Sequence, residues 1–496
     1  MSAAEIRSAW LRAAAGAPCR MLIDGNWVAA ASGETFSCVD PFTGKPWGVI
    51  PLAGAPDVDR AVVAARRAFD QDGWGRSAPG YRAALLRKLA TLIEQNAERL
   101  ALNQVMENGK LLSEMSRSGP ALAASCHFFA GLAETLHGYT VQSNVPNYVS
   151  YTRREPMGVV AAITPWNTPL GLLGLKLLPA LAAGNTIVIK PSEVTPSSTL
   201  LLGELIQQAG FPPGVVNVIT GYGRGTGEAL VAHPLVDKIA FTGSTATGTA
   251  IAKVAAERHA RLSLELGGKS PNIIFDDADI ASALKGISAG IFAASGQACN
   301  AGSRVLIQSR IYDDVAERLT KLARSLKVGD PLDSDTELGP LASAAQLKKV
   351  TGYVDIGRAE GFSILAGGRA IDRPGYFVEA TIFDRVRNDA RIAREEIFGP
   401  VASLIPFADE DEAIAIANDS VYGLASGIWT ESLGRAHRVI ERLRAGIVWV
   451  NTYRMGATVM PFGGMKQSGI GREGGLNALD HYTEEKAVWI NTRPER

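Results

Sequence analysis

Short apolar runs alternate with helix-like segments through the middle of the chain. The runs fall at residues 158–163, 186–189, 215–219, 238–241 and 262–266. Buried strands that alternate with helices are typical of a parallel sheet with right-handed crossovers. The pattern therefore predicts an α/β domain built on such a sheet.

The chain before this alternation has a different pattern. Residues 22–28 read as a β-hairpin that turns at Asp24-Gly25. From Asp57 to Phe69 apolar residues recur at three- and four-residue steps, which predicts a helix. Further helical patterns cover residues 84–108, ended by Gly109, and residues 113–136. A weakly alternating polar segment, 139–151, then leads into the sheet.

A second α/β unit follows residue 266. Its predicted strands include 272–275 and 305–307, with others near Ile364 and at 447–450, and residues 486–490 form a final strand. The sequence has no internal repeat, and no low-complexity linker separates the two units. We therefore expect a close interface, with an active site in the cleft between them.

Composition excludes several classes of protein. Fifty basic residues balance 50 acidic ones, so no strong net charge points to nucleic acid or to an anionic membrane. No apolar stretch reaches the roughly 18 residues of a spanning helix, because Lys176 and Pro179 interrupt residues 170–183. Four cysteines without a CxxC motif favour a reducing, cytoplasmic location, and six histidines without ligand spacing predict no metal site.

Cys299 is the candidate nucleophile. It lies in residues 296–304 (GQACNAGSR), between a helix of small residues predicted at 287–295 and the strand 305–307. Glycines on both sides would let a ligand approach the backbone closely, and a thiolate there could attack an electrophilic carbon. The alternative is that Cys299 is a small buried hydrophobic residue.

Three further motifs bear on that choice: residues 264–270 (LELGGKS), 165–167 (PWN) and 395–400 (EEIFGP). Together with Cys299 the chain resembles the NAD(P)-dependent aldehyde dehydrogenase family, from about Leu22 to Trp489. The resemblance implies a Rossmann-type NAD(P)-binding domain, an α/β catalytic domain and a small β oligomerisation arm. The corresponding boundaries are 1–136 and 154–266 for the first domain, 267–476 for the second, and 137–153 and 477–496 for the arm. In the arm, the resemblance implies that residues 139–151 form one strand.

The resemblance also implies a chemistry. Cys299 would add to the aldehyde, with Asn167 as an oxyanion donor, and Glu265 would activate water against the resulting thioester. Glu473 matches a proton-relay carboxylate, although Gly474-Gly475 replaces the family's usual sequence after it. Alternatives are a semialdehyde dehydrogenase that transfers the acyl group to coenzyme A, which Glu265 disfavours, and a non-catalytic homologue.

No register of residues 221–227 (GYGRGTG) satisfies the GxGxxG dinucleotide fingerprint. Residues 241–248 (FTGSTATG) are better placed, because they follow a strand and open a helix, where free N–H groups favour a pyrophosphate. By resemblance the expected cofactor-binding residues are Ile163, Trp166, Lys190, Ser192, Glu193, Gly223, Gly227, Phe241, Gly243, Ser244, Gly248, Leu266, Glu396 and Phe398. Glu193 favours NAD over NADP by repelling a 2′-phosphate, whereas the Ser192 hydroxyl leaves NADP open.

The resemblance places a substrate tunnel along Leu172, Leu175, Ala298, Asn300, Gly456 and Phe462. Several relatives carry an aromatic side chain where this chain has Gly456, so we expect a wider entrance and a bulkier or aromatic aldehyde. The alternative is that Met455 or Met460 fills the gap. Family members pair a tail strand with the arm of another subunit, which predicts a homodimer or homotetramer.

Overall fold

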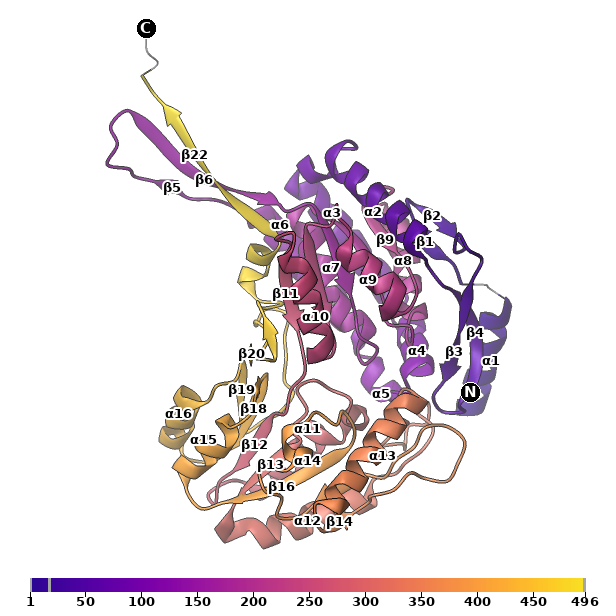
Figure 1. Ribbon diagram of the computed structural model, residues 1–496, viewed down its shortest axis with the longest axis vertical. Helices are drawn as coiled ribbons and strands as arrows, with labels where there is room; N and C mark the ends of the chain where they lie inside the picture. The colour runs from indigo at the N-terminus through magenta and orange to yellow at the C-terminus, as the bar shows by residue number, and fades with distance from the viewer. Residues whose placement is uncertain (1, 17–18, 494–496) are drawn as a thin grey trace.

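The computed structural model describes residues 2–16 and 19–493. Figure 1 shows two bodies, each built around one large sheet, and a narrow arm that projects from the first body. The arm is the antiparallel sheet β22-β6-β5, formed by Thr483–Asn491, Tyr148–Pro156 and Thr140–Val141. Strand β22 runs toward its tip (Figure 1).

The first sheet has eight strands in the order β2-β1-β9-β8-β7-β10-β11-β21. The five from β9 to β11 are mutually parallel, as the apolar runs predict. Along the chain they lie in the order third, second, first, fourth, fifth, which is the Rossmann order. The strands are β1 Met21–Ile23, β2 Asn26–Val28, β7 Val159–Ile163, β8 Thr186–Lys190, β9 Val216–Val218, β10 Lys238–Thr242, β11 Arg261–Glu265 and β21 Gly469–Ile470.

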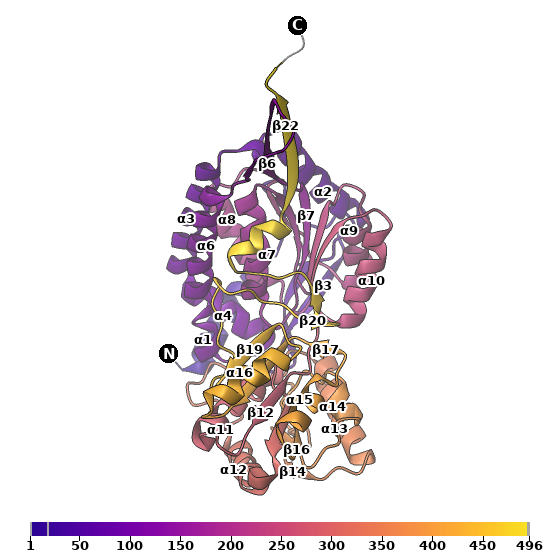
Figure 2. The same cartoon turned by 90° about the vertical axis from the view of Figure 1, so that its left-hand side faces the viewer.

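Helices cover both faces of this sheet (Figure 2). Apolar residues of one helical layer pack with one set of strand side chains, and those of the other layer pack with the alternate set. One layer is α2 Ala55–Asp70, α9 Glu228–Ala232 and α10 Thr245–Ala256. The other is α3 Pro79–Gln95, α6 Ser118–Thr135, α7 Pro169–Ala183 and α8 Ser197–Ala209.

The second sheet has seven strands in the order β14-β15-β16-β13-β12-β18-β19, parallel except for β14. They are β12 Pro271–Ile274, β13 Arg304–Gln308, β14 Ile364–Ala366, β15 Thr381–Phe383, β16 Val401–Phe407, β18 Ala425–Trp429 and β19 Ile447–Val450. Helices α11 Ile280–Ile291 and α12 Tyr312–Ser325 pack on one face. Helices α13 Ala344–Ala359, α14 Arg391–Arg394, α15 Glu410–Asn418 and α16 Leu433–Arg442 pack on the other.

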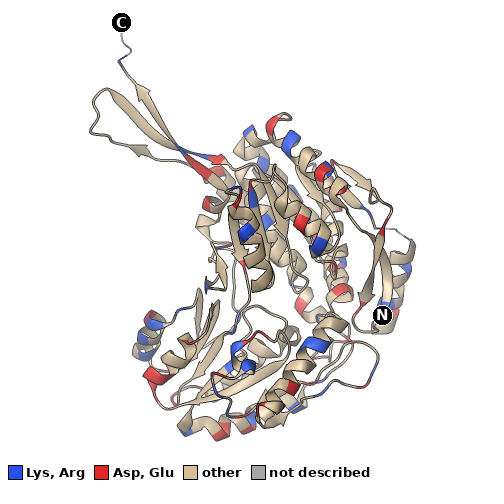
Figure 3. Ribbon diagram, in the orientation of Figure 1, with Lys and Arg blue, Asp and Glu red and all other residues tan. Residues whose placement is uncertain are grey.

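Shorter elements complete the chain. They are α1 Ala3–Gly16, β3 Thr35–Asp40, β4 Lys45–Pro51, η1 Trp74–Arg76, α4 Ala97–Asn108, α5 Leu112–Met115, η2 Gly223–Gly227, η3 Ala293–Gly296, η4 Ser309–Ile311, β17 Tyr422–Gly423, β20 Met465–Lys466 and η5 Leu476–His481. Within the described ranges no helix is long and apolar enough to cross a membrane. Basic and acidic residues are interspersed over both bodies, and those of the arm gather at its base (Figure 3).

Four predicted elements differ from the structure. The helical pattern at 113–136 is two helices, α5 and α6, separated at residues 116–117. The helical pattern at 84–108 is two helices, α3 and α4, because Asn96 leaves the helical region at φ −111° and ψ 15°. The polar segment 139–151 is a hairpin rather than a single strand. The helix predicted at 287–295 ends at Ile291, and the left-handed backbone of Ala294 and Ser295 prevents it from continuing to residue 295. The division into domains after residues 136, 153, 266 and 476 stays a prediction.

Candidate active site

The loop that carries Cys299 is bent sharply before β13. Ala294 and Ser295 have φ angles of 54° and 53°, which residues other than glycine rarely adopt outside constrained sites. At Gly296, with φ +70°, a Cβ would lie 2.1 Å from the carbonyl oxygen of Gly399, so only glycine fits. The loop thus brings Cys299 to the amino end of the second sheet, partly exposed.

Asn167 holds this loop from the other body. It lies in the turn between β7 and α7, is buried, and donates through Nδ2 to the carbonyl oxygen of Gln297 at 3.0 Å. Gln297 in turn accepts the backbone N–H of Ala342 at 2.9 Å. The side-chain amide of Asn167 is therefore fixed beside the segment that leads to Cys299.

Glu265 is the last residue of β11 and is 1% exposed. Neither of its carboxylate oxygens forms a hydrogen bond with a described residue. Burial and the charge of Glu473 raise the pKa of Glu265 well above its ordinary value, while Lys176 and the Cys299 thiol act in the opposite direction. Burial and the nearby Glu265 likewise raise the pKa of Cys299. The thiol and the carboxyl are thus close neighbours.

A buried ion pair lies behind Glu265. The Nζ of Lys176 is 2.5 Å from Oε1 of Glu473 and 2.6 Å from the hydroxyl of Thr242. Gly474 and Gly475 follow with φ angles of +66° and +73°, a conformation that favours glycine. The unusual Gly474-Gly475 sequence thus accommodates two successive left-handed residues after Glu473.

A pocket of about 200 Å³ opens between the two bodies. Nine of the predicted site residues line it together: Trp166, Asn167, Leu172, Gly243, Ser244, Leu266, Cys299, Glu396 and Phe398. Pro165, Thr242, Gly267, Gln346 and Lys349 complete its wall. The expected cleft between the two units is therefore present, and Cys299 lies in it.

Glu396 and Phe398 form one wall of the pocket. Glu396 accepts the N–H of Gly268 at 3.0 Å, and a Cβ on Gly267 would lie 2.8 Å from its Oε2. Phe398 has φ 60° and stacks edge-on with Trp166, at 5.2 Å between ring centroids. Glycines at 267 and 268 therefore let backbone and carboxylate approach closely.

The opposite wall lies at the carboxyl edge of the first sheet. Strand order reverses between β7 and β10, and ligands of open α/β sheets bind at such switch points. Ile163 ends β7, and Phe241 and Gly243 lie at the end of β10. Ser244 caps α10, and its hydroxyl accepts the N–H of Thr247 at 3.2 Å. The amino end of α10 thus opens toward this edge.

The remaining predicted cofactor residues lie around the neighbouring strand β8. Lys190 ends it, is buried, and donates to the carbonyl of Pro191 at 3.0 Å, with Glu193 at 4.0 Å. The Ser192 hydroxyl accepts the N–H of Val194. Gly223 begins the irregular turn η2 and Gly227 ends it. A Cβ on Gly227 would lie 3.6 Å from the side chain of Lys190. Gly248 packs against Leu266, leaving no room for a side chain.

Of the predicted tunnel residues, Leu172 lines the pocket with Cys299, and the others lie outside its lining. Leu175 is one helical turn beyond Leu172 on α7, and Ala298 and Asn300 flank the cysteine. Phe462 pairs through its backbone with Glu473. A Cβ on Gly456 would meet nothing within 4 Å, and Met455 and Met460 are 67% and 64% exposed. Neither methionine therefore fills the space beside Gly456.

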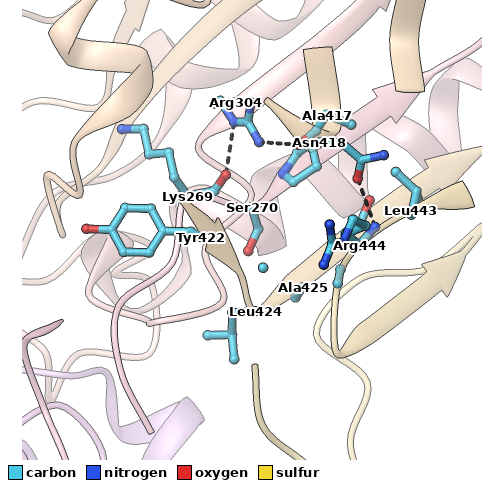
Figure 4. A pocket seen from close by; sticks show the side chains of 14 residues that line it. Lys269, Ser270, Arg304, Ala417, Asn418, Tyr422, Leu424, Ala425, Leu443 and Arg444 are labelled. Carbon is cyan, nitrogen blue, oxygen red and sulfur yellow. Dashed lines mark hydrogen bonds between the residues drawn. The ribbon is translucent and has the colours of Figure 1, made fainter. Parts of the chain in front are cut away.

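A second, smaller hollow lies behind the LELGGKS segment (Figure 4). Arg304 is fully buried there and donates to the carbonyls of Lys269, Ile416 and Ala417 and to the side chain of Asn388. These bonds tie the segment that follows Glu265 to the second body. Lys269 is buried without a hydrogen bond to a described residue, and burial lowers its pKa to about 7.

Sequence reasoning missed several residues of the site. Lys176 was noted only as a break in an apolar stretch, yet a lone lysine in such a helix signals a buried partner. Gln346 on α13 holds the loop of Phe398 by donating to the carbonyl of Phe398 at 2.6 Å. Nothing in the sequence near Gln346 or Lys349 marks them, because α13 reaches the pocket only through the tertiary fold.

Among the described residues, no three or more His, Cys, Asp or Glu side chains group in a way that could hold a metal ion.

Comparison with known proteins identifies the family to which the site belongs. The model of the aldehyde dehydrogenase family matches residues 27–488. An aldehyde dehydrogenase of Aspergillus niger is 46% identical over 473 residues, which cover 95% of each chain.

Two solved structures are similar over nearly their whole length. An NAD+ complex of an aldehyde dehydrogenase from Bacillus cereus superposes with a TM-score of 0.96 at 44% identity, covering 98% of this chain and 99% of that one. A betaine aldehyde dehydrogenase of Staphylococcus aureus, also with NAD+, superposes with a TM-score of 0.97 at 38% identity, covering 99% and 98%. The chain therefore belongs to the aldehyde dehydrogenase family.

Proposed function

We propose that this protein oxidises an aldehyde to the carboxylic acid with NAD+. The aldehyde carbon loses a hydride to NAD+, water supplies the second oxygen, and one proton is released, with a second released when the acid ionises. The observation that carries the proposal is the meeting of three groups: the partly exposed Cys299, the fixed amide of Asn167 and the buried carboxyl of Glu265. They belong to three separate parts of the chain and to both bodies.

In this proposal the Cys299 thiolate adds to the aldehyde carbon and forms a thiohemiacetal. Negative charge develops on the former carbonyl oxygen, which Asn167 Nδ2 and the backbone N–H of Cys299 stabilise. Removal of one such donor typically costs about a hundred- to thousandfold in rate. The hydrogen bond from Asn167 to Gln297 supports this role, because it orients the amide before substrate binds.

Loss of hydride leaves a thioester on Cys299, and Glu265 is the base that activates water against it. A general base works best when its pKa lies near the working pH. Burial raises the pKa of Glu265 in that direction, and its oxygens are free of hydrogen bonds to described residues. The Lys176–Glu473 pair behind it offers a route by which the proton leaves.

The pocket suits a nicotinamide dinucleotide. The capped amino end of α10 at the switch point suits the pyrophosphate, and the glycine at 243 keeps the backbone accessible. Lys190 and Glu193 would hold the adenine ribose with Ser192 beside them, and Glu396 and Phe398 the nicotinamide half. The remaining contacts are assigned to Ile163, Trp166, Gly223, Gly227, Phe241, Ser244, Gly248 and Leu266.

One assay separates this proposal from its alternatives. NADH formation is followed with simple aldehydes, with and without coenzyme A. The proposal expects oxidation without coenzyme A and free acid as the product. Oxidation only with coenzyme A would favour acyl transfer, and failure with every aldehyde would favour a non-catalytic homologue.

We also propose that the protein is a homodimer or homotetramer formed through its arm. Tyr148, Val149, Trp489 and Ile490 are exposed on strands β6 and β22. Val149 pairs with Ile490 and Tyr148 with Asn491, so these side chains lie on both faces of the arm, and exposed apolar residues of this kind favour burial against another copy. Val149→Lys should shift the sedimentation coefficient toward that of a smaller species, whereas Val63→Lys, at a similarly exposed valine on α2, should not.

All four cysteines are free, which fits a reducing compartment. We therefore retain the cytoplasmic location as part of the proposal.

A further inference from the structure

Two cations lie near Cys299 but do not line the cofactor pocket. Arg454 is half-buried in the loop after β19, and Lys110 is buried just after α4. Neither forms an ion pair within the described part of the chain. Arg454 lies close enough to lower the pKa of both Cys299 and Lys110. An aldehyde bound at Cys299 would therefore lie near positive charge.

The structure holds Arg454 in place. Its backbone has φ 61°, and its Nη1 donates to the carbonyls of Ala289 and Ala293 at 3.2 and 3.3 Å. These carbonyls belong to α11 and η3, the segment that leads to Cys299. The Nε and Nη2 donors of Arg454 form no hydrogen bond with a described residue, so they remain available to a ligand.

The loop that carries Arg454 is held by hydrogen bonds and leaves space beside Gly456. Tyr453 donates to the carbonyl of Asn300 at 3.0 Å, and Trp449 donates to the carbonyl of Met455 at 2.8 Å. The hydroxyls of Ser125 and Thr458 are 2.5 Å apart, which ties the loop to α6. Beside Arg454, Gly456 faces open space. A ligand group longer than an aldehyde can thus reach the guanidinium.

Lys110 adds a second positive charge deeper in the protein. Its Nζ donates to the hydroxyl of Thr168 at 3.0 Å, next to Asn167. The nearest acidic group that acts on it is Glu114, one oxygen of which already accepts the N–H of Ala294 at 2.8 Å. Glu396 lines the cofactor pocket, and Glu265 ends strand β11 at the same edge of the sheet. The two cations, Arg454 and Lys110, therefore outnumber Glu114, the acidic residue that acts on Lys110.

We infer that Arg454, with Lys110 behind it, forms a subsite for a carboxylate, so that the preferred substrate is an aldehyde that carries a carboxylate some carbons away. The guanidinium offers paired donors that match a carboxylate, and such charge-assisted bonds are about twice as strong as neutral ones. The inference rests on the proposed function, since it names the substrate class of the same site. A trimethylammonium aldehyde would be repelled by the same two cations.

The test compares matched pairs of aldehydes. Succinic semialdehyde is set against butanal, adipic semialdehyde against hexanal, and terephthalaldehydic acid against benzaldehyde, with kcat/KM measured for each from NADH formation. Wild type should favour the carboxylated member of at least one pair, and betaine aldehyde should be the poorest substrate. Arg454→Gln should reduce that preference by roughly tenfold to a hundredfold while kcat/KM for the uncharged member stays near that of wild type.

Arg454→Lys keeps the charge without the paired donors and should retain part of the preference. Arg310→Gln removes an exposed arginine of η4, in the same body as Arg454 but outside the lining of the pocket, and is the matched control, expected to change nothing. Equal kcat/KM for charged and uncharged members in wild type would overturn the inference. So would an Arg454→Gln variant that loses both activities alike, because that would make Arg454 a support of the loop. Failure of wild type with every aldehyde would instead overturn the proposed function.

Discussion

The Nζ of Lys176 lies 2.5 Å from Oε1 of Glu473, although the two residues are 297 positions apart in the chain. Lys176 is completely buried and Glu473 nearly so. A buried cation of this kind stabilises the carboxylate form of its neighbours, and Lys176 lowers the pKa of both Glu473 and Glu265. Lys176 therefore opposes the effect of burial, which raises the pKa of both carboxyl groups.

Lys176→Met should move the acidic limb of the kcat–pH profile to higher pH. Without the cation the pKa of Glu265 rises further, so the base becomes ionised only at a higher pH. The variant should also lose about 3–5 kcal/mol of stability, since it leaves a buried charge unpaired. Stopped assays across pH and denaturant unfolding check both effects. Lys285→Met, at an exposed helix position, should show neither.

Cys299→Ala should abolish oxidation while NAD+ binding persists, because the lost thiol belongs to the chemistry rather than to the nucleotide wall. NADH absorbance and cofactor titration measure the two properties. In the wild type, mass spectrometry should show the first iodoacetamide adduct at Cys299, because this cysteine lines the open pocket, whereas Cys38 and Cys126 are buried and Cys19 lies outside the pocket lining. Near-normal turnover by the alanine variant would refute the mechanism.

Glu265→Gln should slow deacylation more than acylation. The amide cannot accept a proton from water, whereas addition of Cys299 and hydride transfer can still proceed. Rapid mixing should therefore show a burst of NADH, near one equivalent per site, followed by slow turnover. If the variant has neither a burst nor a slower steady state, Glu265 is not the base.

Wild type should prefer NAD+ to NADP+, and Glu193→Ala should narrow that preference. Glu193 is part-exposed at the end of β8, where its carboxylate would meet a 2′-phosphate. The comparison is kcat/KM for the two cofactors in both proteins. Glu204→Ala, which removes an exposed acid of α8, is the control. A wild type that prefers NADP+ contradicts the assignment.

The alternation of apolar runs predicted the parallel strands well, because a strand buried on both faces needs a continuous apolar run. Helix boundaries were predicted less well than the strands. The break at Asn96 and the early end of α11 depend on single backbone angles that sequence periodicity does not record. The arm was predicted as one strand because the turn between β5 and β6 is polar like its flanks.

The candidate site, like the fold, was predicted only in part. Motifs marked Cys299 and Glu265, and the structure brings them together with Asn167. Lys176 and Arg454 were not assigned, because each is a single charged residue whose meaning comes from a partner or a cavity distant in sequence. Short motifs record the local backbone that chemistry requires, whereas long-range charge pairing follows only from the fold.

The last prediction concerns the width of the tunnel. A Cβ at position 456 would meet nothing within 4 Å, and its backbone φ is not in the left-handed region, so Gly456→Phe should fold without strain. Met455 and Met460 are largely exposed and leave the gap open. We therefore expect wild type to prefer hexanal and benzaldehyde to acetaldehyde, since a wider apolar entrance buries more of a larger substrate.

The phenyl ring in Gly456→Phe should then narrow the entrance and lower kcat/KM for the two larger aldehydes, while acetaldehyde is affected little. Gly456→Ala is the matched control. Its methyl group is too small to narrow the entrance, so selectivity should stay unchanged. Because all three aldehydes are uncharged, their ranking reports tunnel width independently of the cation at Arg454. A wild type that prefers acetaldehyde, or a phenylalanine variant with the selectivity of wild type, would show that Gly456 serves only the turn.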